Sequence, residues 1–396
     1  MSTALLILGL LAAASTVTAL VRVRHPGMIS PLVMMTGWLV GELPLLHLLL
    51  QVLVTGVLVG SGALDEPSGW VGLIAMVLSW AGLVRVRTVA NRARGVLADA
   101  LAAAGHAEAA SEVRERRPDP GTLWRPFHFD KRGIDVVRDI PFGDLEGQRL
   151  DVYRPAGLSE GEARGVMFYI HGGGWVMGYR ERQGLPMLHQ MTRRGWVCVS
   201  VDYRLAPRNR WPAQFEDVAR GLEWTVDNIA EFGGPPSGIV VSGGSAGGHL
   251  AALTALDERT GPLVSGCVPI YGAFDFTDHL DIRGYAAMRP FLERMVMTTK
   301  LGEDREGWMA ASPIHLIHED VPPFFVVHGA LDVFLYTEET RAFVERLAAV
   351  SSQPIAYAEV PGAQHAFEIF HSVRAAATVD AIEAFSNAVV GGAPRE

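Results

Sequence analysis

Cysteine is nearly absent from this sequence of 396 residues, which contains only Cys198 and Cys267. Two cysteines far apart in the chain cannot form the disulfide framework of a small secreted domain, and we expect both to be buried free thiols. Charged residues are also scarce, at 19% against 49% hydrophobic residues, and the net charge is -9. The hydrophobic content excludes a disordered chain, and the excess of acidic residues argues against a nucleic-acid-binding protein.

Charge is almost missing from the first 84 positions, where apolar segments cover residues 4–21, 28–60 and 70–84. The charged residues of this region are Arg22, Arg24, Glu42, Asp65 and Glu66. A helix needs about 20 apolar residues to cross a bilayer, so residues 1–85 are predicted to be an all-α transmembrane region of about three spans. The sequence Glu42-Leu43-Pro44 interrupts the second segment, which we interpret as one kinked or tilted span with an interfacial lead-in rather than a hairpin.

The flanking charges predict how this region lies in the membrane. Arginines follow the first and third apolar segments, and the acidic pair at 65–66 follows the second. These arginines are Arg22, Arg24, Arg85, Arg87, Arg92 and Arg94. Under the positive-inside rule, three crossings put both arginine clusters and the remaining chain on the cytoplasmic side. A cleaved signal peptide at residues 1–19 is the alternative, but the basic n-region of such a peptide is missing.

The remaining chain divides at about residue 130. Residues 86–130 are predicted to be a helical linker or cap, with one helix over 88–117 that ends before Pro118. From 131 to 391, short apolar strands alternate with amphipathic helices, which predicts a mostly parallel sheet covered on both faces. An insertion at about 274–320 breaks this alternation and is predicted to be a lid.

Eight strands and five helices are expected in this second part. The strands are 134–140, 149–153, 166–170, 196–201, 238–242, 264–270, 324–327 and 355–360, and the helices are 185–194, 213–232, 246–258, 338–350 and 366–389. The first two strands are joined by a turn that contains Gly143, so we expect them to pair antiparallel.

A serine follows the predicted strand at 238–242, within Gly243-Gly244-Ser245-Ala246-Gly247. The pattern G-x-S-x-G between a strand and a helix is typical of a nucleophile on a sharp turn, where larger side chains would obstruct the backbone and the substrate. An ordinary tight turn is the alternative in a chain with 43 glycines. The position directly after an apolar strand favours the nucleophile.

Three glycines follow the strand at 166–170, in His171-Gly172-Gly173-Gly174-Trp175. At this place in such an architecture, backbone N–H groups form the oxyanion hole that binds a tetrahedral intermediate. A phosphate-binding loop is the alternative, but its Gly-Lys-Ser/Thr sequence is missing.

An acid and a base follow the serine in the order that this architecture uses. Asp332 comes just after the strand at 324–327, and His365 lies between the strand at 355–360 and a predicted helix. Three other histidines fit the role of base less well. We expect His249 to pack behind the site, His328 to hold a loop and His171 to brace the glycine loop.

Together these motifs resemble the hormone-sensitive-lipase-like branch of the α/β-hydrolases over about residues 130–390. The matching segments are His171-Gly172-Gly173-Gly174-Trp175; Asp202-Tyr203-Arg204-Leu205-Ala206-Pro207 with Pro212-Ala213 and Asp217; Gly243-Gly244-Ser245-Ala246-Gly247-Gly248; His328-Gly329 with Asp332; and His365-Ala366-Phe367. The resemblance implies the α/β-hydrolase fold, with an eight-stranded sheet, and a serine ester hydrolase that needs no cofactor.

The resemblance also implies the roles of individual residues. Ser245 would be the nucleophile, His365 the base and Asp332 the acid that orients it, with oxyanion donors from Gly173, Gly174 and Ala246. The supporting motif residues are His171, Gly172, Trp175, Gly243 and Gly247. One position departs from the family, because Gly244 stands where many members carry Asp. That variant resembles small-ester and formamide hydrolases, so the acyl preference stays open.

The leading hypothesis is a membrane-anchored carboxylesterase or lipase whose partners are a lipophilic ester substrate and membrane lipid. An amide or formamide hydrolase and an acyltransferase with the same triad remain alternatives, as does a non-catalytic ligand receptor on this fold. No metal-binding motif occurs in the sequence, and no nucleic-acid partner is expected.

Overall fold

A computed structural model of the chain describes residues 1–23, 30–159, 161–282 and 288–391. Three sequence predictions fall partly outside these residues. They concern Arg24, the first residues of the second apolar segment, and residues 283–287 of the predicted lid.

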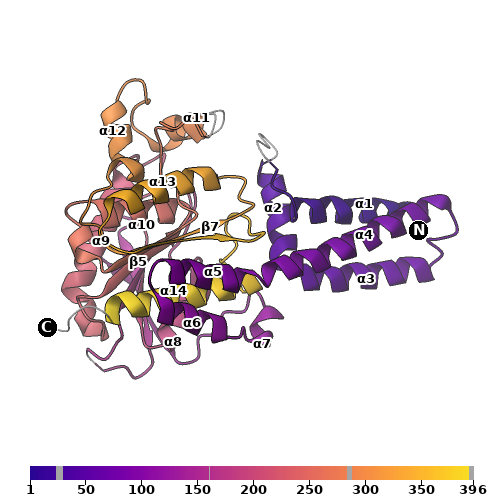
Figure 1. Cartoon of the computed structure of the whole chain (residues 1–396), viewed down its shortest axis with the longest axis horizontal. Helices are drawn as coiled ribbons and strands as arrows, with labels where there is room; N and C mark the ends of the chain where they lie inside the picture. The colour runs from indigo at the N-terminus through magenta and orange to yellow at the C-terminus, as the bar shows by residue number, and fades with distance from the viewer. Residues whose placement is uncertain (24–29, 160, 283–287, 392–396) are drawn as a thin grey trace.

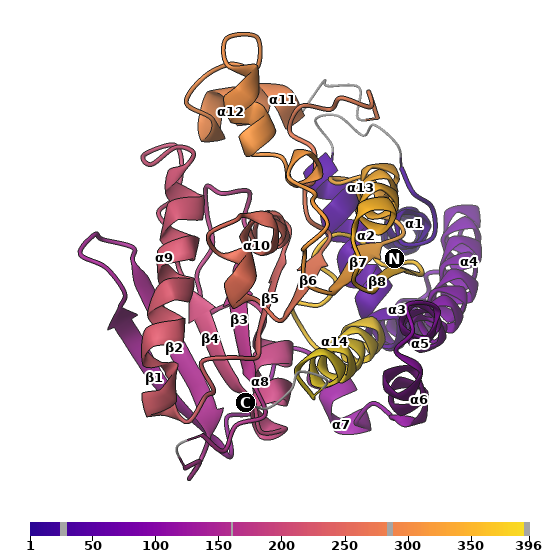
Figure 2. The ribbon, with the colours of Figure 1, turned by 60° about the vertical axis from the view of Figure 1, so that its left-hand side comes forward.

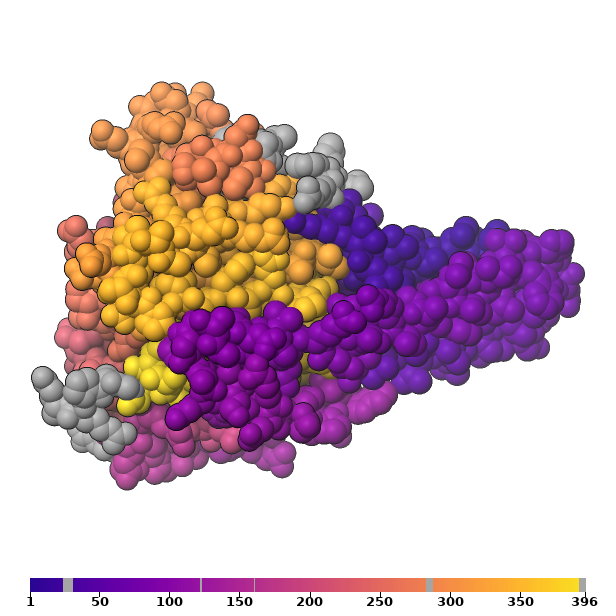
Figure 3. Space-filling model, in the orientation of Figure 1, coloured from indigo at the N-terminus to yellow at the C-terminus, as the bar shows by residue number. Residues whose placement is uncertain are grey.

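Three apolar helices form a rod that projects from the rest of the molecule (Figures 1 and 3). They are α1 (Ser2–Thr18), α3 (Pro44–Gly60) and α4 (Pro67–Ala90). Buried hydroxyls connect α1 and α4, since the oxygens of Thr16 and Ser79 are 2.7 Å apart. Large apolar side chains cover the outside of the rod, among them Leu11, Leu53 and Leu78, each more than 60% exposed.

The second apolar segment is bent where the sequence predicted a kink. Helix α2 (Ser30–Glu42) and helix α3 meet at an angle of 92°. Proline has no N–H group and fits the first turn of a helix, so Pro44 ends one helix and starts the next. Helix α2 lies between the rod and the α/β part of the chain (Figure 1).

By length and composition, one helix of the described residues is suited to cross a membrane. It covers Pro67–Ala103, and the bent pair of α2 and α3 would be a second candidate if it formed one span. Helix α1 is apolar but only 17 residues long.

The prediction of a single helix over 88–117 was wrong. The structure has the end of α4 followed by α5 (Ala93–Ala103), α6 (Ala107–Glu115) and the short α7 (Pro120–Leu123). Gly105, at a φ of +87°, provides the left-handed residue that ends α5. Helix α5 then packs against β8, and α6 packs against the last helix (Val373–Gly391), where Arg116 binds Glu383 at 2.6 Å.

The sheet has eight strands, as predicted, in the order β1-β2-β4-β3-β5-β6-β7-β8. The strands are β1 (Ile134–Pro141), β2 (Arg149–Pro155), β3 (Val166–Ile170), β4 (Val197–Val201), β5 (Ile239–Gly244), β6 (Gly266–Ile270), β7 (Phe324–Gly329) and β8 (Ile355–Val360). Strand β2 pairs antiparallel with β1 and β4, and the other pairs are parallel. The fold is therefore that of an α/β-hydrolase.

Helices cover both faces of this sheet (Figure 2). One face carries α8 (Leu185–Arg193), α14 (Val373–Gly391) and α5, and the other carries α9 (Ala213–Asn228), α10 (Ala246–Leu256) and α13 (Thr337–Val350). Every residue of β3, β4 and β5 is buried, because these central strands are covered on both sides.

The last helix starts later than predicted, at Val373 instead of Ala366. Residues 366–372 form a loop, and the hydroxyl of Ser372 accepts a hydrogen bond of 3.0 Å from the N–H of Ala375. A serine in this position is an N-cap, which satisfies a free N–H group at the start of a helix.

The described residues of the insertion, 274–282 and 288–320, contain short helical segments. These are α11 (Met288–Phe291), a π-helical turn (Leu292–Val296), α12 (Arg305–Ala310) and a 3-10 turn (Pro313–His315). Two further 3-10 turns, Ile229–Phe232 and Gly261–Leu263, lie elsewhere in the domain. The insertion contacts α10, where His249 Nε2 is 2.8 Å from the carbonyl oxygen of Ala311.

Candidate active site

Ser245 lies on the sharp turn between β5 and α10. Its φ and ψ of 59° and -118° are a strained conformation for a residue with a side chain. A Cβ atom at Gly243 or Gly247 would lie 2.4 or 2.0 Å from the carbonyl oxygen of Ile170, so β3 approaches this turn too closely for any side chain. The two glycines of the motif are therefore required by packing, and Ser245 itself stays partly exposed.

His365 is hydrogen-bonded to both Ser245 and Asp332. Its Nε2 atom is 2.9 Å from Ser245 Oγ, and its Nδ1 atom is 2.6 Å from Asp332 Oδ2. An ionised carboxylate only accepts hydrogen bonds, so Nδ1 carries the proton and Nε2 is free to accept from the hydroxyl. The structure thus brings together the three residues that the sequence predicted from separate strand ends.

The Asp332 carboxylate is completely buried and held on both oxygens. Its Oδ1 atom accepts hydrogen bonds from the N–H groups of Phe334 and Leu335, at 2.8 and 2.9 Å. Burial alone would raise the pKa of Asp332, but the rings of His365 and His328 outweigh burial and keep this pKa below its ordinary value. Asp332 is therefore ionised at neutral pH and fixed in orientation.

His328 holds the loop that carries Asp332, as predicted. Its Nε2 atom is 3.0 Å from the carbonyl oxygen of Leu335, and its Nδ1 atom is 2.7 Å from Thr340 Oγ1. The ring is completely buried.

The glycine loop lies directly beside the serine turn. A Cβ atom at Gly172 would be 2.6 Å from the carbonyl oxygen of Gly244, and Gly173 and Gly174 adopt positive φ values of 125° and 60°. Within the part of the chain that the structure describes, the N–H groups of Gly173, Gly174 and Ala246 have no protein acceptor. Such groups can bind an oxyanion formed at Ser245.

The remaining motif residues support this loop. His171 stacks on Tyr203 with ring centroids 4.3 Å apart, and its Nδ1 atom is 2.8 Å from the carbonyl oxygen of Gly172. Burial lowers the pKa of His171, so its ring is neutral and structural. The indole of Trp175 donates to His249 Nδ1 at 3.2 Å, which places His249 behind the site as expected.

Two further side chains near His365 were not identified from the sequence. The ring of Tyr271 lies 4.6 Å from the His365 ring, and the Tyr271 hydroxyl donates to the buried carboxylate of Glu368. The ring of Phe334 packs edge-on against His365 at 5.5 Å and is 38% exposed. The sequence signal that could have identified Glu368 is its position three residues after His365.

A cluster of metal-ligand type occurs in the insertion. Ligand atoms of Asp275, His279 and His315 lie within 4.8 Å of one another. Both oxygens of Asp275 already accept hydrogen bonds, from Thr277 Oγ1 at 2.6 Å and from His279 Nδ1 at 2.7 Å. Asp275, Thr277 and His279 thus form a hydrogen-bond network within the insertion.

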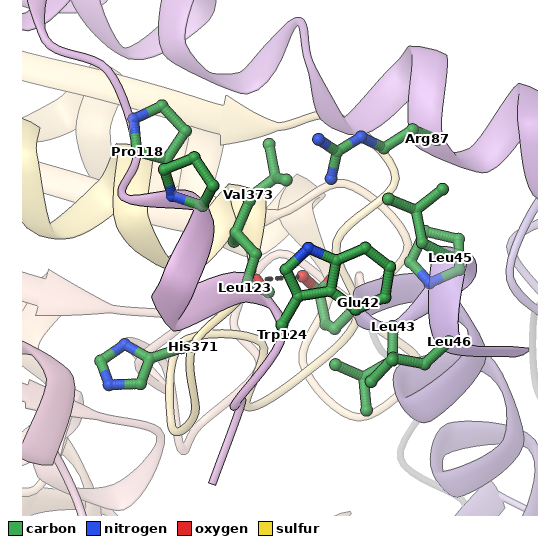
Figure 4. A pocket seen from close by; sticks show the side chains of 13 residues that line it. Glu42, Leu43, Leu45, Leu46, Arg87, Pro118, Leu123, Trp124, His371 and Val373 are labelled. Atoms are coloured by element: carbon green, nitrogen blue, oxygen red, sulfur yellow. Dashed lines mark hydrogen bonds between the residues drawn. The ribbon is translucent and has the colours of Figure 1, made fainter. Parts of the chain in front are cut away.

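A cavity of about 260 Å³ lies between the helical rod and the α/β domain (Figure 4). Leu43, Leu45, Arg87, Trp124 and His371 are among the residues that line it. Glu42 also reaches it, and its carboxylate accepts hydrogen bonds from Ser372 and Arg374 of the hydrolase domain. No residue of the Ser245 site lines this cavity.

Comparison with known proteins identifies a family model and several curated sequences that are similar to this chain. The BD-FAE family model matches residues 150–347. The probable carboxylic ester hydrolase LipM of Mycobacterium tuberculosis is 35% identical over 398 residues, which cover 96% of this chain and 92% of LipM. The esterase LipC of the same organism is 38% identical over 263 residues, which cover 64% of this chain and 65% of LipC.

Solved structures of the same kind share the fold. The carboxylesterase EstE1, cloned from a metagenomic library, matches with a TM-score of 0.56 and 26% sequence identity. That match covers 66% of this chain and 91% of EstE1. The match to LipM extends over nearly the whole chain, so LipM also matches the sequence of the apolar helices.

Proposed function

Because this chain belongs to the BD-FAE family and is a carboxylic ester hydrolase, we propose that it is a membrane-anchored serine esterase for lipophilic esters. Ser245, His365 and Asp332 are its catalytic triad. The observation that carries this proposal is the continuous pair of hydrogen bonds, 2.9 and 2.6 Å long, that runs from the serine through the imidazole to the carboxylate.

The proposed reaction follows from these contacts. His365 Nε2 takes the proton of Ser245 while Oγ attacks the ester carbonyl carbon, and the carbonyl electron pair moves onto oxygen. The imidazolium, stabilised by Asp332, then donates the proton to the leaving alkoxide. Water attacks the acyl-enzyme by the same route and releases the carboxylic acid and free Ser245.

The backbone N–H groups of Gly173, Gly174 and Ala246 bind the developing oxyanion in this proposal. Their lack of protein acceptors in the described residues supports the role, because they need no rearrangement when charge develops. Loss of one oxyanion donor typically costs about 3 kcal/mol of transition-state stabilisation.

Membrane anchoring is supported by the helical rod. Its exposed surface is apolar, and an aqueous solvent would oppose the exposure of so many leucines on adjacent helices. We propose that α1, α3 and α4 each span the bilayer. The loop between α3 and α4, which contains Asp65 and Glu66, then lies at the far end of the rod (Figure 1). Arg22 and Arg87 lie next to the hydrolase domain, since Arg22 binds the carbonyl oxygen of Asp332 and Arg87 lines the cavity with His371.

This arrangement predicts that the hydrolase domain faces the cytoplasm. The test is protease protection of a C-terminal tag in sealed vesicles of known orientation. Right-side-out spheroplasts should protect the tag, and permeabilisation should expose it. Digestion of the tag in intact spheroplasts would reject the orientation and leave the esterase proposal untouched.

A lipophilic substrate is supported by the surroundings of the triad. Phe334 packs on His365, and a Cβ atom at Gly174 would be 3.6 Å from the ring of Phe291 in the insertion. Met177, which follows the glycine loop, is 64% exposed. These side chains favour apolar acyl or alcohol groups over charged ones.

Fluorophosphonate labelling tests the triad directly. The reagent should label the full-length wild type at one site, and Ser245→Ala should abolish labelling without changing the thermal midpoint. Equal labelling of Ser245→Ala, or an unlabelled wild type, would refute the proposal. The replacement of Ser111, an exposed serine on α6, by alanine is the matched control and should label like the wild type.

A series of p-nitrophenyl esters of increasing chain length, compared with the matching anilides, tests the substrate class. We expect esters to react faster than anilides, with kcat/KM rising from acetate to medium-length acyl chains. Faster turnover of anilides would favour an amide hydrolase instead. Transfer of the acyl group from the acyl-enzyme to an added alcohol, in preference to water, would favour an acyltransferase.

A further inference from the structure

The loop that carries Asp332 is bound by a residue from the N-terminal apolar region. We call residues 330–337 the acid loop. Arg22, which follows α1, donates from Nε to the carbonyl oxygen of Asp332 at 3.2 Å. Its Nη1 atom binds the carboxylate of Glu338, directly after this loop, at 3.0 Å, and its guanidinium lies 5.0 Å from the centre of the Tyr336 ring.

The loop that carries His365 is bound by the same region. We call residues 361–372 the base loop. The indole N–H of Trp38, on α2, donates to the carbonyl oxygen of Ala366 at 2.8 Å, and the Trp38 ring lies 5.0 Å from the ring of Phe370. On the other side of His365, Gln364 donates to the carbonyl oxygen of Thr18 at 3.4 Å. The residues directly before and after His365 are thus both hydrogen-bonded to residues of the N-terminal apolar region.

Apolar packing joins the two loops to α2. Val33 and Met34 of α2 form a small buried cluster with Val333 of the acid loop, and Ala366 of the base loop packs against it. One helix therefore contacts both the residue after the acid and the residue after the base.

The base loop needs such support because its backbone is strained. Ala366 has a φ of +62°, in the left-handed region that residues with a side chain rarely adopt. A strained residue persists only when its surroundings hold it. The hydrogen bond from Trp38 holds the carbonyl group of this residue, one position after His365.

We propose that α2 and the segment that follows α1 are a positioning element of the active site, in which Trp38 holds the base loop and Arg22 holds the acid loop. The apolar helices then align the triad as well as anchor the protein. This inference rests on the proposed function, since it concerns the same Ser245, His365 and Asp332. Displacement of a reacting group by about 1 Å can lower the rate about 100-fold. Loss of the Trp38 or the Arg22 hydrogen bond should therefore cause a measurable decrease in kcat.

The test uses Trp38→Phe in the full-length protein. Phenylalanine keeps an aromatic ring against Phe370 but lacks the N–H group that donates to the carbonyl oxygen of Ala366. The matched control is Trp70→Phe, because the Trp70 indole donates to the carbonyl oxygen of Leu64 at 3.1 Å in the loop before α4. The assay measures kcat and KM for p-nitrophenyl acetate per fluorophosphonate-labelled site, together with the pH profile of kcat.

We expect Trp38→Phe to lower kcat per labelled site at least tenfold, with little change in KM and a shifted pH profile for the base. Trp70→Phe should match the wild type in all three. If Trp38→Phe reduces only the number of labelled sites and leaves kcat per site and the pH profile unchanged, Trp38 is merely structural and the proposal is overturned. A wild type that is not labelled would refute the proposed function instead.

Arg22→Gln tests the acid loop in the same assay. It should lower kcat per labelled site, and Arg22→Lys, which keeps the charge near Glu338, should recover part of the loss. Arg85→Gln removes an exposed arginine of α4 and should have no effect. Equal kcat values and pH profiles for Arg22→Gln and Arg85→Gln would remove Arg22 from the positioning element.

Discussion

Tyr271 donates a hydrogen bond to the buried carboxylate of Glu368 directly behind the turn that carries Ser245. A Cβ atom at Gly244, one position before the serine, would lie 2.7 Å from the Tyr271 hydroxyl and 3.0 Å from Glu368 Oε1. The pair therefore occupies the space that a side chain at position 244 would need. This explains why Gly244 stands at a position where many members of the hormone-sensitive-lipase-like branch have aspartate.

The first prediction follows from that contact. Gly244→Ala should lower the free energy of unfolding by about 1–3 kcal/mol, the usual cost of forcing an extra carbon into a packed interior. It should also slow fluorophosphonate labelling, because the strained turn must shift. Tyr271→Phe removes the nearer atom, so the double variant should recover part of the lost stability. Thermal unfolding and labelling rates measure both effects, and a fully stable Gly244→Ala would contradict the prediction.

The second prediction concerns the charge of Glu368. Burial raises the pKa of Glu368 from 4.5 to about 7, although its contact with Tyr271 opposes this shift. The folded protein therefore holds the proton more tightly than the unfolded chain does. The resulting stabilisation is complete below about pH 4.5 and is lost as the pH rises through about 7, and it amounts to about 3 kcal/mol.

Glu368→Gln tests this by removing the titration with little change in shape. The thermal midpoint of the wild type should fall more between pH 5 and pH 8 than the midpoint of Glu368→Gln. Glu108→Gln changes an exposed residue of α6 and should keep the wild-type pH dependence. Parallel pH profiles for all three proteins would show that Glu368 does not titrate in this range.

Much of the domain could be predicted because its signals are local. Strands β3 and β8 were predicted with their observed bounds. Strand β3 is a continuous apolar run after Gly165, and β8 lies between Pro354 and Pro361. The positions of Ser245, Asp332 and His365 followed from one rule about strand ends. Contacts between distant segments leave no such local signal. Arg22 was interpreted only as a topological charge, yet it binds Glu338, 316 positions later.

The third prediction concerns the orientation of the base. Asp332→Asn should lower kcat about 10⁴-fold with little change in KM, because an amide at this position favours the wrong tautomer of the His365 imidazole. Kinetics with p-nitrophenyl acetate measures this loss. Asp99→Asn changes an exposed carboxylate that binds Arg114 and should react like the wild type. A loss of less than tenfold in Asp332→Asn would mean that another group orients His365.

The last prediction concerns close packing in the helical rod. A Cβ atom at Gly72 of α4 would lie 2.5 Å from backbone atoms of Leu5 in α1, and one at Gly9 would lie 2.3 Å from the carbonyl oxygen of Gly72. Small residues allow apolar helices to approach closely and are common where such helices associate in membranes. Because backbone atoms cannot rotate away, a side chain at position 72 must separate α1 from α4.

Gly72→Val should therefore lower the thermal midpoint in detergent, whereas Gly56→Val on α3 should not, since no atom lies within 4 Å of a Cβ at Gly56. Both variants add the same β-branched residue to an apolar helix, so their difference isolates the packing of α1 on α4. The segment that follows α1 contains Arg22, which binds the carbonyl group of Asp332, so kcat per labelled site should also fall in Gly72→Val alone. Equal midpoints and equal kcat values for the two variants would contradict both the close packing and its connection to the active site.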